Sequence, residues 1–187
     1  MAFPQVAVLT AAAVLALATA NAPYATAAAA PGAAACVPGK SETRGHSAVD
    51  DLEIRFTEAT KYDDLRKYAI SEWNKIQTIN IAGDTATTVN DLEFRDYTSK
   101  TDGYGGYYEH RGGTAATDYI YLNTHAMEVD FGDDLRYRRN VIVHELGHAL
   151  GLCHKANSAN SVMRENASTI SVPTSVDKAN LKKLWGR

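Results

Sequence analysis

The stretch from His144 to His154, with the sequence HELGHALGLCH, constrains this chain more than any other part of it. On an α-helix, residues four positions apart lie on one face, a single turn apart, so His144 and His148 can present two imidazole nitrogens to the same point. This is the geometry of a pair of metal ligands. A catalytic zinc ion takes three protein ligands and keeps a fourth position for water, so the pair predicts a third ligand nearby.

His154 is the candidate for this third ligand, provided that the chain leaves the helix and turns back. Gly151 can make that turn, because glycine at a helix end adopts the left-handed conformation without the penalty of a Cβ atom. Glu145, beside the first histidine, is then free to act as a general base. Two helical histidines alone are more often ordinary surface or core residues. The complete pattern favours a metal centre with His144, His148 and His154 as ligands.

These residues match the metzincin zinc signature at every defining position. The tripeptide Ser161-Val162-Met163 resembles the Met-turn that follows this signature. From about residue 50 to the C-terminus, the chain resembles the matrixin-like branch of secreted zinc endopeptidases. The resemblance implies one catalytic Zn²⁺ ion, a protein or peptide substrate, and Met163 as a hydrophobic floor beneath the metal.

Two positions depart from related families. Small bacterial neutral proteinases of the snapalysin type have Asp as the third ligand, where this chain has His154. Astacin-like and serralysin-like members carry a Tyr two residues after the Met, whereas this chain has Glu165, so no tyrosine switch is expected. A zincin of the other main type would take its third ligand from a downstream Glu, and Glu165 is the nearby candidate for that alternative.

Residues 1–30 have the pattern of a secretory signal peptide. No charged side chain occurs before Lys40, and an apolar run extends from Val6 to Ala20. The alternative interpretation is a membrane anchor, but this run falls short of the roughly 20 residues that a spanning helix needs. We therefore expect cleavage, secretion to the extracellular space and no stable association with a membrane.

The whole chain of 187 residues has an ordinary globular composition, with 45% hydrophobic and 22% charged residues. A chain of this length favours a single domain. Together with the resemblance, this implies an N-terminal segment at 31–50 and one metzincin-like catalytic domain at 51–187. The formal net charge of −3 argues against nucleic acid as a partner. We expect the protein to act as a monomer.

The two cysteines, Cys36 and Cys153, suggest a disulfide, because the chain is expected to enter an oxidising compartment. Closing so long a loop stabilises a fold in the chain-entropy model, because it restricts the unfolded chain. The alternative is that Cys36 acts as an inhibitory thiolate on the zinc, as in the propeptide switch of matrixins. The sequence around Cys36 lacks the preceding Arg of that switch.

Hydrophobic periodicity predicts an α+β fold. A strand is expected at 52–56 and a helix from a capping box at Thr60 and Asp63 to about Gln77. Further elements are expected as strands at 78–82, 92–97, 106–110 and 119–123, a helix at 134–150, and a last helix opened by Thr174 and Asp177.

The resemblance implies how these elements are arranged. It implies a twisted, mostly parallel five-stranded sheet with an antiparallel edge strand, a backing helix, a central zinc-site helix, the Met-turn and a C-terminal helix. By the same resemblance, the strand at 106–110 borders the substrate cleft, and a peptide adds to it through main-chain hydrogen bonds. A plain surface hairpin is the alternative interpretation of this stretch.

Other candidate metal ligands lack companions at suitable spacing. His110 and His125 could each bind a second zinc ion, but a structural role is favoured for both. Asp130, Asp133 and Asp134 could bind calcium, although they lack a complete calcium-loop pattern. We expect instead that Asp133 or Asp134 caps the zinc helix.

The function that these features predict is hydrolysis of peptide bonds by a secreted zinc-dependent endopeptidase. The ion would activate a water molecule, with Glu145 as general base. Two alternatives stay open: a secreted zinc-binding protein without turnover, and a processing protease or toxin of narrow specificity.

Overall fold

A computed structural model describes residues 32–112 and 116–186, so the expected signal peptide lies outside the described residues. Five strands form one sheet in the order β2-β1-β3-β5-β4. The strands are β1 (Glu53–Ala59), β2 (Asn80–Gly83), β3 (Leu92–Tyr97), β4 (Gly106–Glu109) and β5 (Asp118–Asn123). Neighbouring strands are parallel except β4 and β5, so the predicted antiparallel edge strand is confirmed.

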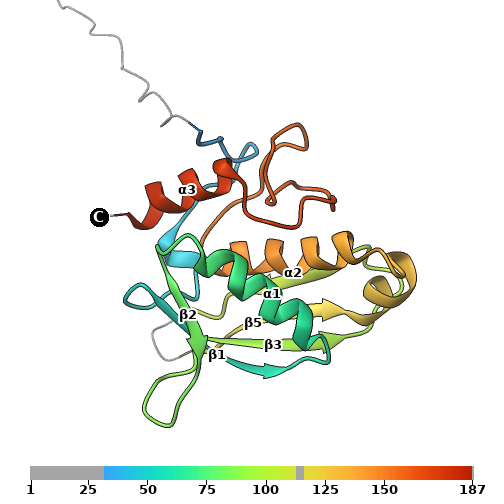
Figure 1. The fold of residues 1–187 in the computed structure, drawn as a ribbon, viewed down its shortest axis with the longest axis horizontal. Helices are drawn as coiled ribbons and strands as arrows, with labels where there is room; N and C mark the ends of the chain where they lie inside the picture. The colour runs from blue at the N-terminus through green and yellow to red at the C-terminus, as the bar shows by residue number, and fades with distance from the viewer. Residues whose placement is uncertain (1–31, 113–115, 187) are drawn as a thin grey trace, which may run out of the picture.

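Helices cover one face of this sheet. The helices are α1 (Asp63–Asn74), α2 (Leu135–Ala149) and α3 (Ser175–Trp185). A 3₁₀ turn at Arg44–His46 and a π-helical turn at Ala126–Asp130 were not predicted. Figure 1 shows α1 and α2 running across the same face of the sheet, with α3 on the far side of α2. The predicted α+β architecture is therefore confirmed.

The core lies between the sheet and the helices, because alternate strand residues point toward the helices. The fully buried strand side chains include Ile54, Leu92, Phe94, Ile120 and Leu122. Trp73 of α1 is also buried, and its indole Nε1 donates a hydrogen bond to the backbone oxygen of Val143 at 2.9 Å. This bond fixes α1 against the middle of α2, the helix that carries the histidine pair.

The predicted start of the first helix is wrong. Thr60 does not cap it, because its hydroxyl donates to Asp96 at 2.6 Å and accepts from the backbone N–H of Tyr62 at 3.1 Å. The helix begins only at Asp63, after Tyr62, which makes no side-chain cap. A long-range partner in β3 has thus replaced the local capping interaction that the sequence pattern suggested.

The predicted caps of the other two helices are present. Asp134 precedes α2 and accepts a hydrogen bond from the backbone N–H of Arg136 at 3.0 Å. Thr174 precedes α3 and accepts from the N–H of Val176 at 3.2 Å, while Asp177 completes a capping box. Both helices therefore begin where their sequences provide an oxygen for the unpaired N–H groups of the first turn.

Residues 33–43 form a segment that we call the N-terminal strap. It passes over the C-terminal end of α2 and beside α3 (Figure 1). The backbone N–H of Thr43 donates to the oxygen of Gly151 at 3.0 Å, and that of Val37 donates to the oxygen of His154, also at 3.0 Å. The strap therefore lies directly against the chain that follows α2.

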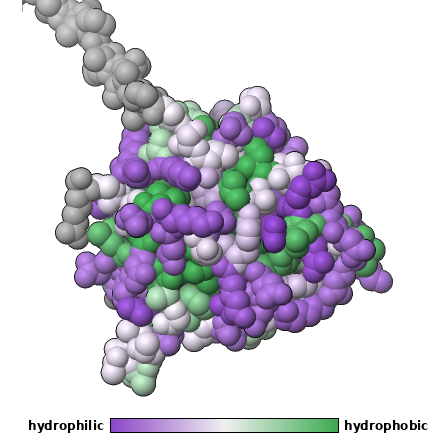
Figure 2. Space-filling view, in the orientation of Figure 1, coloured by the Kyte–Doolittle hydropathy of each residue, from purple (hydrophilic) through white to green (hydrophobic). Residues whose placement is uncertain are grey.

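The molecular surface is mixed in character. On the face drawn in Figure 2, hydrophilic residues predominate and hydrophobic residues reach the surface in separate patches. In the described parts of the chain, we find no helix whose length and hydrophobicity suit it to crossing a membrane.

Candidate metal centre

Two candidate ligands lie on the buried second half of α2. The Nε2 atoms of His144 and His148 are 3.1 Å apart. The Nδ1 atom of His144 contacts the backbone oxygen of Val162 at 2.9 Å, and that of His148 contacts the oxygen of Leu152 at 2.8 Å. Because a carbonyl oxygen can only accept, Nδ1 carries the proton in both rings and Nε2 keeps its lone pair for a metal.

The third histidine arrives by way of a sharp turn after α2. Gly151 has a φ of +84°, the left-handed conformation predicted from its place at the helix end. A Cβ atom there would lie 2.5 Å from the backbone oxygen of Thr43 in the strap, so glycine is required by packing as well. After this turn, Nε2 of His154 lies 3.0 Å from that of His148 and 3.1 Å from that of His144.

The three imidazoles fit a zinc ion. Their Nε2 atoms form a nearly equilateral triangle with sides of 3.0 to 3.1 Å. One ion placed to one side of this triangle can contact all three atoms at the Zn–N distance of about 2.0–2.1 Å. Lone pairs facing one another at this spacing repel, and a cation between them removes the repulsion. The donor set is that of a three-histidine site with a fourth position open.

Burial keeps these rings in the neutral form that binds metals. It lowers the pKa of His144 to about 4, the pKa of His148 well below its ordinary value, and the pKa of His154 to a smaller extent. The cause in each case is loss of hydration, which disfavours the charged imidazolium. A neutral imidazole is the state that metal binding requires, so no proton has to be displaced at neutral pH.

Glu145 follows the first histidine on α2 and is almost completely buried, with 8% of its surface exposed. Burial raises the pKa of its carboxyl to about 8, against the opposing effect of a hydrogen bond with the backbone of Tyr108. Among the described residues, no Lys, Arg or His forms an ion pair with it. A cation on the three imidazoles would favour its ionised form.

Two glycines bring the edge strand β4 close to this carboxyl. A Cβ atom at Gly105 would lie 2.6 Å from the side chain of Val141 on α2. A Cβ atom at Gly106 would lie 2.6 Å from the backbone oxygen of Tyr121 and 3.5 Å from Cγ of Glu145. Because neither residue has a side chain, the start of β4 packs directly against the helix beside Glu145.

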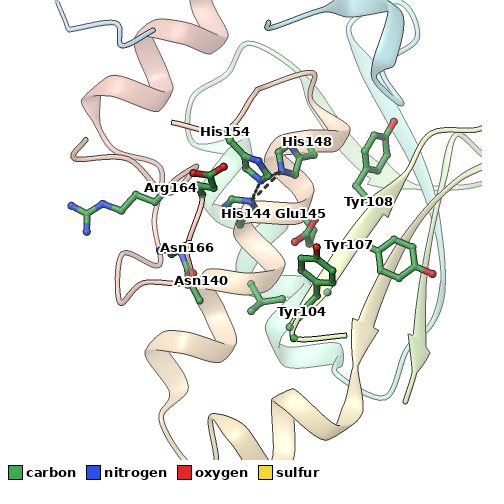
Figure 3. A pocket seen from close by; sticks show the side chains of 16 residues that line it. Tyr104, Tyr107, Tyr108, Asn140, His144, Glu145, His148, His154, Arg164 and Asn166 are labelled. Atoms are coloured by element: carbon green, nitrogen blue, oxygen red, sulfur yellow. Dashed lines mark hydrogen bonds between the residues drawn. The ribbon is translucent and has the colours of Figure 1, made fainter. Parts of the chain in front are cut away.

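These groups line a cleft of about 410 Å³. One side is formed by residues 103–108, which include β4, and the other by residues 164–167. Figure 3 shows the three imidazoles pointing toward one another, with the Glu145 carboxyl beside them on the side of β4. The side chain of Arg164 points away from the imidazoles, and Tyr104, which is 64% exposed, stands at the rim.

The predicted Met-turn lies against the helix beneath the histidines. Met163 is fully buried, and a Cβ atom at Gly147 would overlap its sulfur, so α2 is in contact with it through a glycine. Asp177 fixes the turn, because its carboxylate accepts hydrogen bonds from the hydroxyl of Ser161 and from the N–H of Val162. The oxygen of Val162 in turn holds His144.

Sequence reasoning missed this second role of Asp177. The sequence pattern identified only its local capping of α3, and no signal in the sequence connects it with residues 161 and 162. The connection depends on how α3 packs against the Met-turn.

The structure contains a disulfide between Cys36 and Cys153, whose Cα atoms are 5.7 Å apart. It attaches the strap to the residue immediately before His154. Because the two sulfurs are bonded to each other, the alternative of Cys36 as an inhibitory thiolate on the metal is contradicted. Sequence reasoning overlooked the neighbouring Lys155 and its partner Glu42, which join the strap to this segment right beside the disulfide, where Nζ of Lys155 lies 3.2 Å from Sγ of Cys153.

The two other histidines considered as metal ligands each lie next to a carboxylate. His110 Nδ1 is 2.9 Å from the carboxylate of Asp118, and His125 Nδ1 is 3.5 Å from that of Asp130. Within residues 32–112 and 116–186, two groups bring three potential ligand atoms within 4.8 Å of one another. One is the histidine triad, and the other is the disulfide pair together with Glu42.

The fold and the three convergent imidazoles define an α+β domain with three histidines arranged so that they could hold one metal ion. Residues 35–186 match the sequence model of the matrixin peptidases, so the chain belongs to the matrixin family. This is a family of zinc metallopeptidases, which act on proteins or peptides.

Other comparisons add little to this assignment. No curated protein matches the chain. Among solved structures, it is similar to one described as the GM1-bound form of the ECX AB5 holotoxin, with 14% sequence identity and a TM-score of 0.46. The alignment covers 71% of this chain and 78% of the other. A likeness at this level carries no argument about function.

Proposed function

We propose that the chain is a secreted, monomeric endopeptidase that hydrolyses peptide bonds at one zinc ion held by His144, His148 and His154. The observation that carries the proposal is the convergence of the three Nε2 atoms, at 3.0 to 3.1 Å from one another, in a cleft beside Glu145. The catalytic domain is proposed at 51–187. The leader at 1–30 and the disulfide are consistent with export to an oxidising compartment.

The metal and the side chain of Glu145 have separate roles in the proposed reaction. When bound, zinc polarises the substrate carbonyl and lowers the pKa of a water molecule toward about 7. Glu145 takes a proton from the attacking water and passes it to the amine that leaves. Its place suits this role, because its carboxylate lines the cleft beside the three imidazoles and pairs with no Lys, Arg or His among the described residues.

The edge strand β4 is the proposed site of substrate binding. Among the described residues it pairs with β5 on one side only, so its other edge can accept an extended peptide, although the backbone of Tyr108 there already bonds to Glu145. Residues 103–108 line the cleft next to Glu145, so a peptide added to β4 would run past the reacting groups. This placement supports an endopeptidase, because the cleft is bordered along a strand to which a peptide chain can be added.

Replacement of Glu145 by Gln tests the mechanism. The amide preserves size but cannot accept the proton, so zinc should stay bound while hydrolysis of unfolded casein falls by a factor of 100 or more, about the contribution of a general base. Zinc content and casein cleavage are measured on the same sample. Activity at the level of the unchanged protein would refute the role of Glu145.

Two further variants test the third ligand. His154→Ala should remove zinc, whereas Glu165→Ala should leave it bound, because Nε2 of His154 is the atom that completes the triangle. The opposite result would favour the zincin type that uses a downstream Glu.

The alternatives of a zinc-binding protein without turnover and of a protease with narrow specificity are separated by activity. The first would bind zinc and cleave no peptide in a library, and the second would cleave a few related sequences. A chelator-sensitive cleavage profile of the mature protein therefore decides among all three functions.

A further inference from the structure

Lys155, the residue after the third histidine, is completely buried. Its Nζ donates a hydrogen bond to the backbone oxygen of Ala34 at 2.9 Å and forms an ion pair with Glu42 at 2.6 Å, both in the strap. Asn180 of α3 donates to the same carboxylate and to the oxygen of Ala34. A buried ammonium group is tolerated only when it is paired in this way, so the strap and Lys155 depend on each other.

The backbone of Lys155 makes a second set of contacts. Its N–H donates to the oxygen of Met163 at 2.7 Å, and its own oxygen accepts from the N–H of Glu165 at 3.1 Å. These bonds form a parallel bridge with the Met-turn segment. Lys155 therefore connects three parts of the molecule, namely the strap, α3 and the Met-turn, at a point adjacent to His154.

His154 differs from the other two histidines in how it is held. The Nδ1 atoms of His144 and His148 are each bonded to a backbone oxygen. For His154, we find no Nδ1 hydrogen bond among the described residues. Its backbone oxygen accepts from the N–H of Val37 in the strap. Its position must therefore come mainly from the backbone of its own segment, which Lys155 anchors.

We propose that Lys155, through its buried ion pair with Glu42, is a positioning residue that fixes the third histidine of the metal centre. The inference rests on the proposed zinc site. Lys155 does not touch the metal or the substrate; it acts through the backbone of His154. Groups that orient a metal ligand typically change metal affinity by about 10-fold to 100-fold when they are removed.

The test compares Lys155→Met with Arg66→Met. Arg66 on α1 is also a buried cation, 4% exposed, and it pairs with Glu58 and Asp63 outside the cleft and the strap. Both substitutions remove a buried positive charge and leave a carboxylate without its partner. The rate of zinc release to a chromophoric chelator is measured for each folded protein with the disulfide intact, at a temperature below unfolding.

Lys155→Met should release zinc about 10-fold to 100-fold faster than the unchanged protein. Arg66→Met should lower the melting temperature but release zinc at the original rate. Equal release rates for Lys155→Met and the unchanged protein would overturn the proposal, and so would equal acceleration in both variants, because the effect would then be general destabilisation.

Glu42→Gln provides a second variant in case Lys155→Met does not fold. Its amide oxygen can still accept from Asn180 and Lys155, but the buried ammonium loses its counter-charge, so zinc release should again accelerate. Release at the original rate contradicts the proposal. The unchanged protein separates the two hypotheses: if it binds no zinc, the proposed function fails, whereas zinc binding that is insensitive to residues 42 and 155 refutes only the positioning role.

Discussion

The two halves of the proposed metal centre are built in different ways. His144 and His148 are one turn apart on α2, so the helix itself sets their spacing. The Nδ1 atom of each ring bonds to one backbone oxygen. His154 lies beyond the helix, in a segment held by the strap, the Met-turn and a disulfide. The first half is therefore determined locally, and the second depends on contacts with distant parts of the chain.

This difference predicts where the centre is most easily damaged. Changes to the loop that carries His154 should weaken metal binding together with stability. Changes of similar severity at the N-terminal end of α2 should lower stability but leave metal binding unchanged. The reason is that the second half of α2, as long as it stays helical, is enough to position His144 and His148. Four variants and one control variant test this contrast in decreasing order of expected effect.

The largest effect is expected from Cys36→Ala combined with Cys153→Ala. The disulfide closes a sequence separation of 117 residues, and the chain-entropy model gives a loss of about 5 kcal/mol on its removal. The free energy of unfolding is measured by urea denaturation, and zinc affinity by competition with a chelator. Both should fall, because the strap is no longer attached beside His154. Unchanged zinc affinity in the folded variant would show that the strap does not support the third ligand.

Gly151→Ala should have the next largest effect. Its φ of +84° disfavours a side chain, and a Cβ atom would meet the backbone of Thr43 at 2.5 Å. We expect a loss of roughly 3 kcal/mol in the free energy of unfolding and a weaker affinity for zinc.

Gly39→Ala is the matched control for Gly151→Ala. Gly39 has a φ of +78°, but nothing lies within 4 Å of its Cβ position, so the cost should be about 1 kcal/mol and come from conformation alone. If both variants lose the same stability, the contact between Gly151 and the strap is not important.

The same contrast explains what the sequence could predict. The spacing of His144 and His148, the left-handed Gly151 and the caps at Asp134 and Thr174 follow from local rules, and the structure has each of these local features. The disulfide followed from there being two cysteines in a chain that the sequence predicts to be exported.

Features that depend on long-range contacts were not predicted, or were predicted wrongly. Thr60 bonds to Asp96 in another strand and does not cap α1. Asp177 holds the Met-turn as well as its own helix, and Lys155 is a buried cation although lysine is ordinarily exposed. Periodicity and spacing contain no information about such partners, because they arise only when the strap, α3 and the Met-turn pack together.

The smallest effect is expected from Asp134→Ala, which removes the N-cap of α2. Loss of one cap should lower the melting temperature by about 2–4 °C in a chain of this size. The first turn of α2 lies about three turns from His144, and the buried second half of the helix is held by Trp73 and the sheet, so fraying should not reach the metal. Zinc affinity should therefore stay unchanged.

Thr174→Ala removes the cap of α3 and should lower the melting temperature by a similar amount. However, α3 holds the Met-turn and the strap through Asp177 and Asn180, so this variant should also weaken zinc binding slightly. Two caps that contribute equally to the melting temperature would then differ in their effect on zinc affinity. If Asp134→Ala weakens zinc binding as much as Thr174→Ala does, α2 does not form its half of the centre independently, and the distinction between the two halves is wrong.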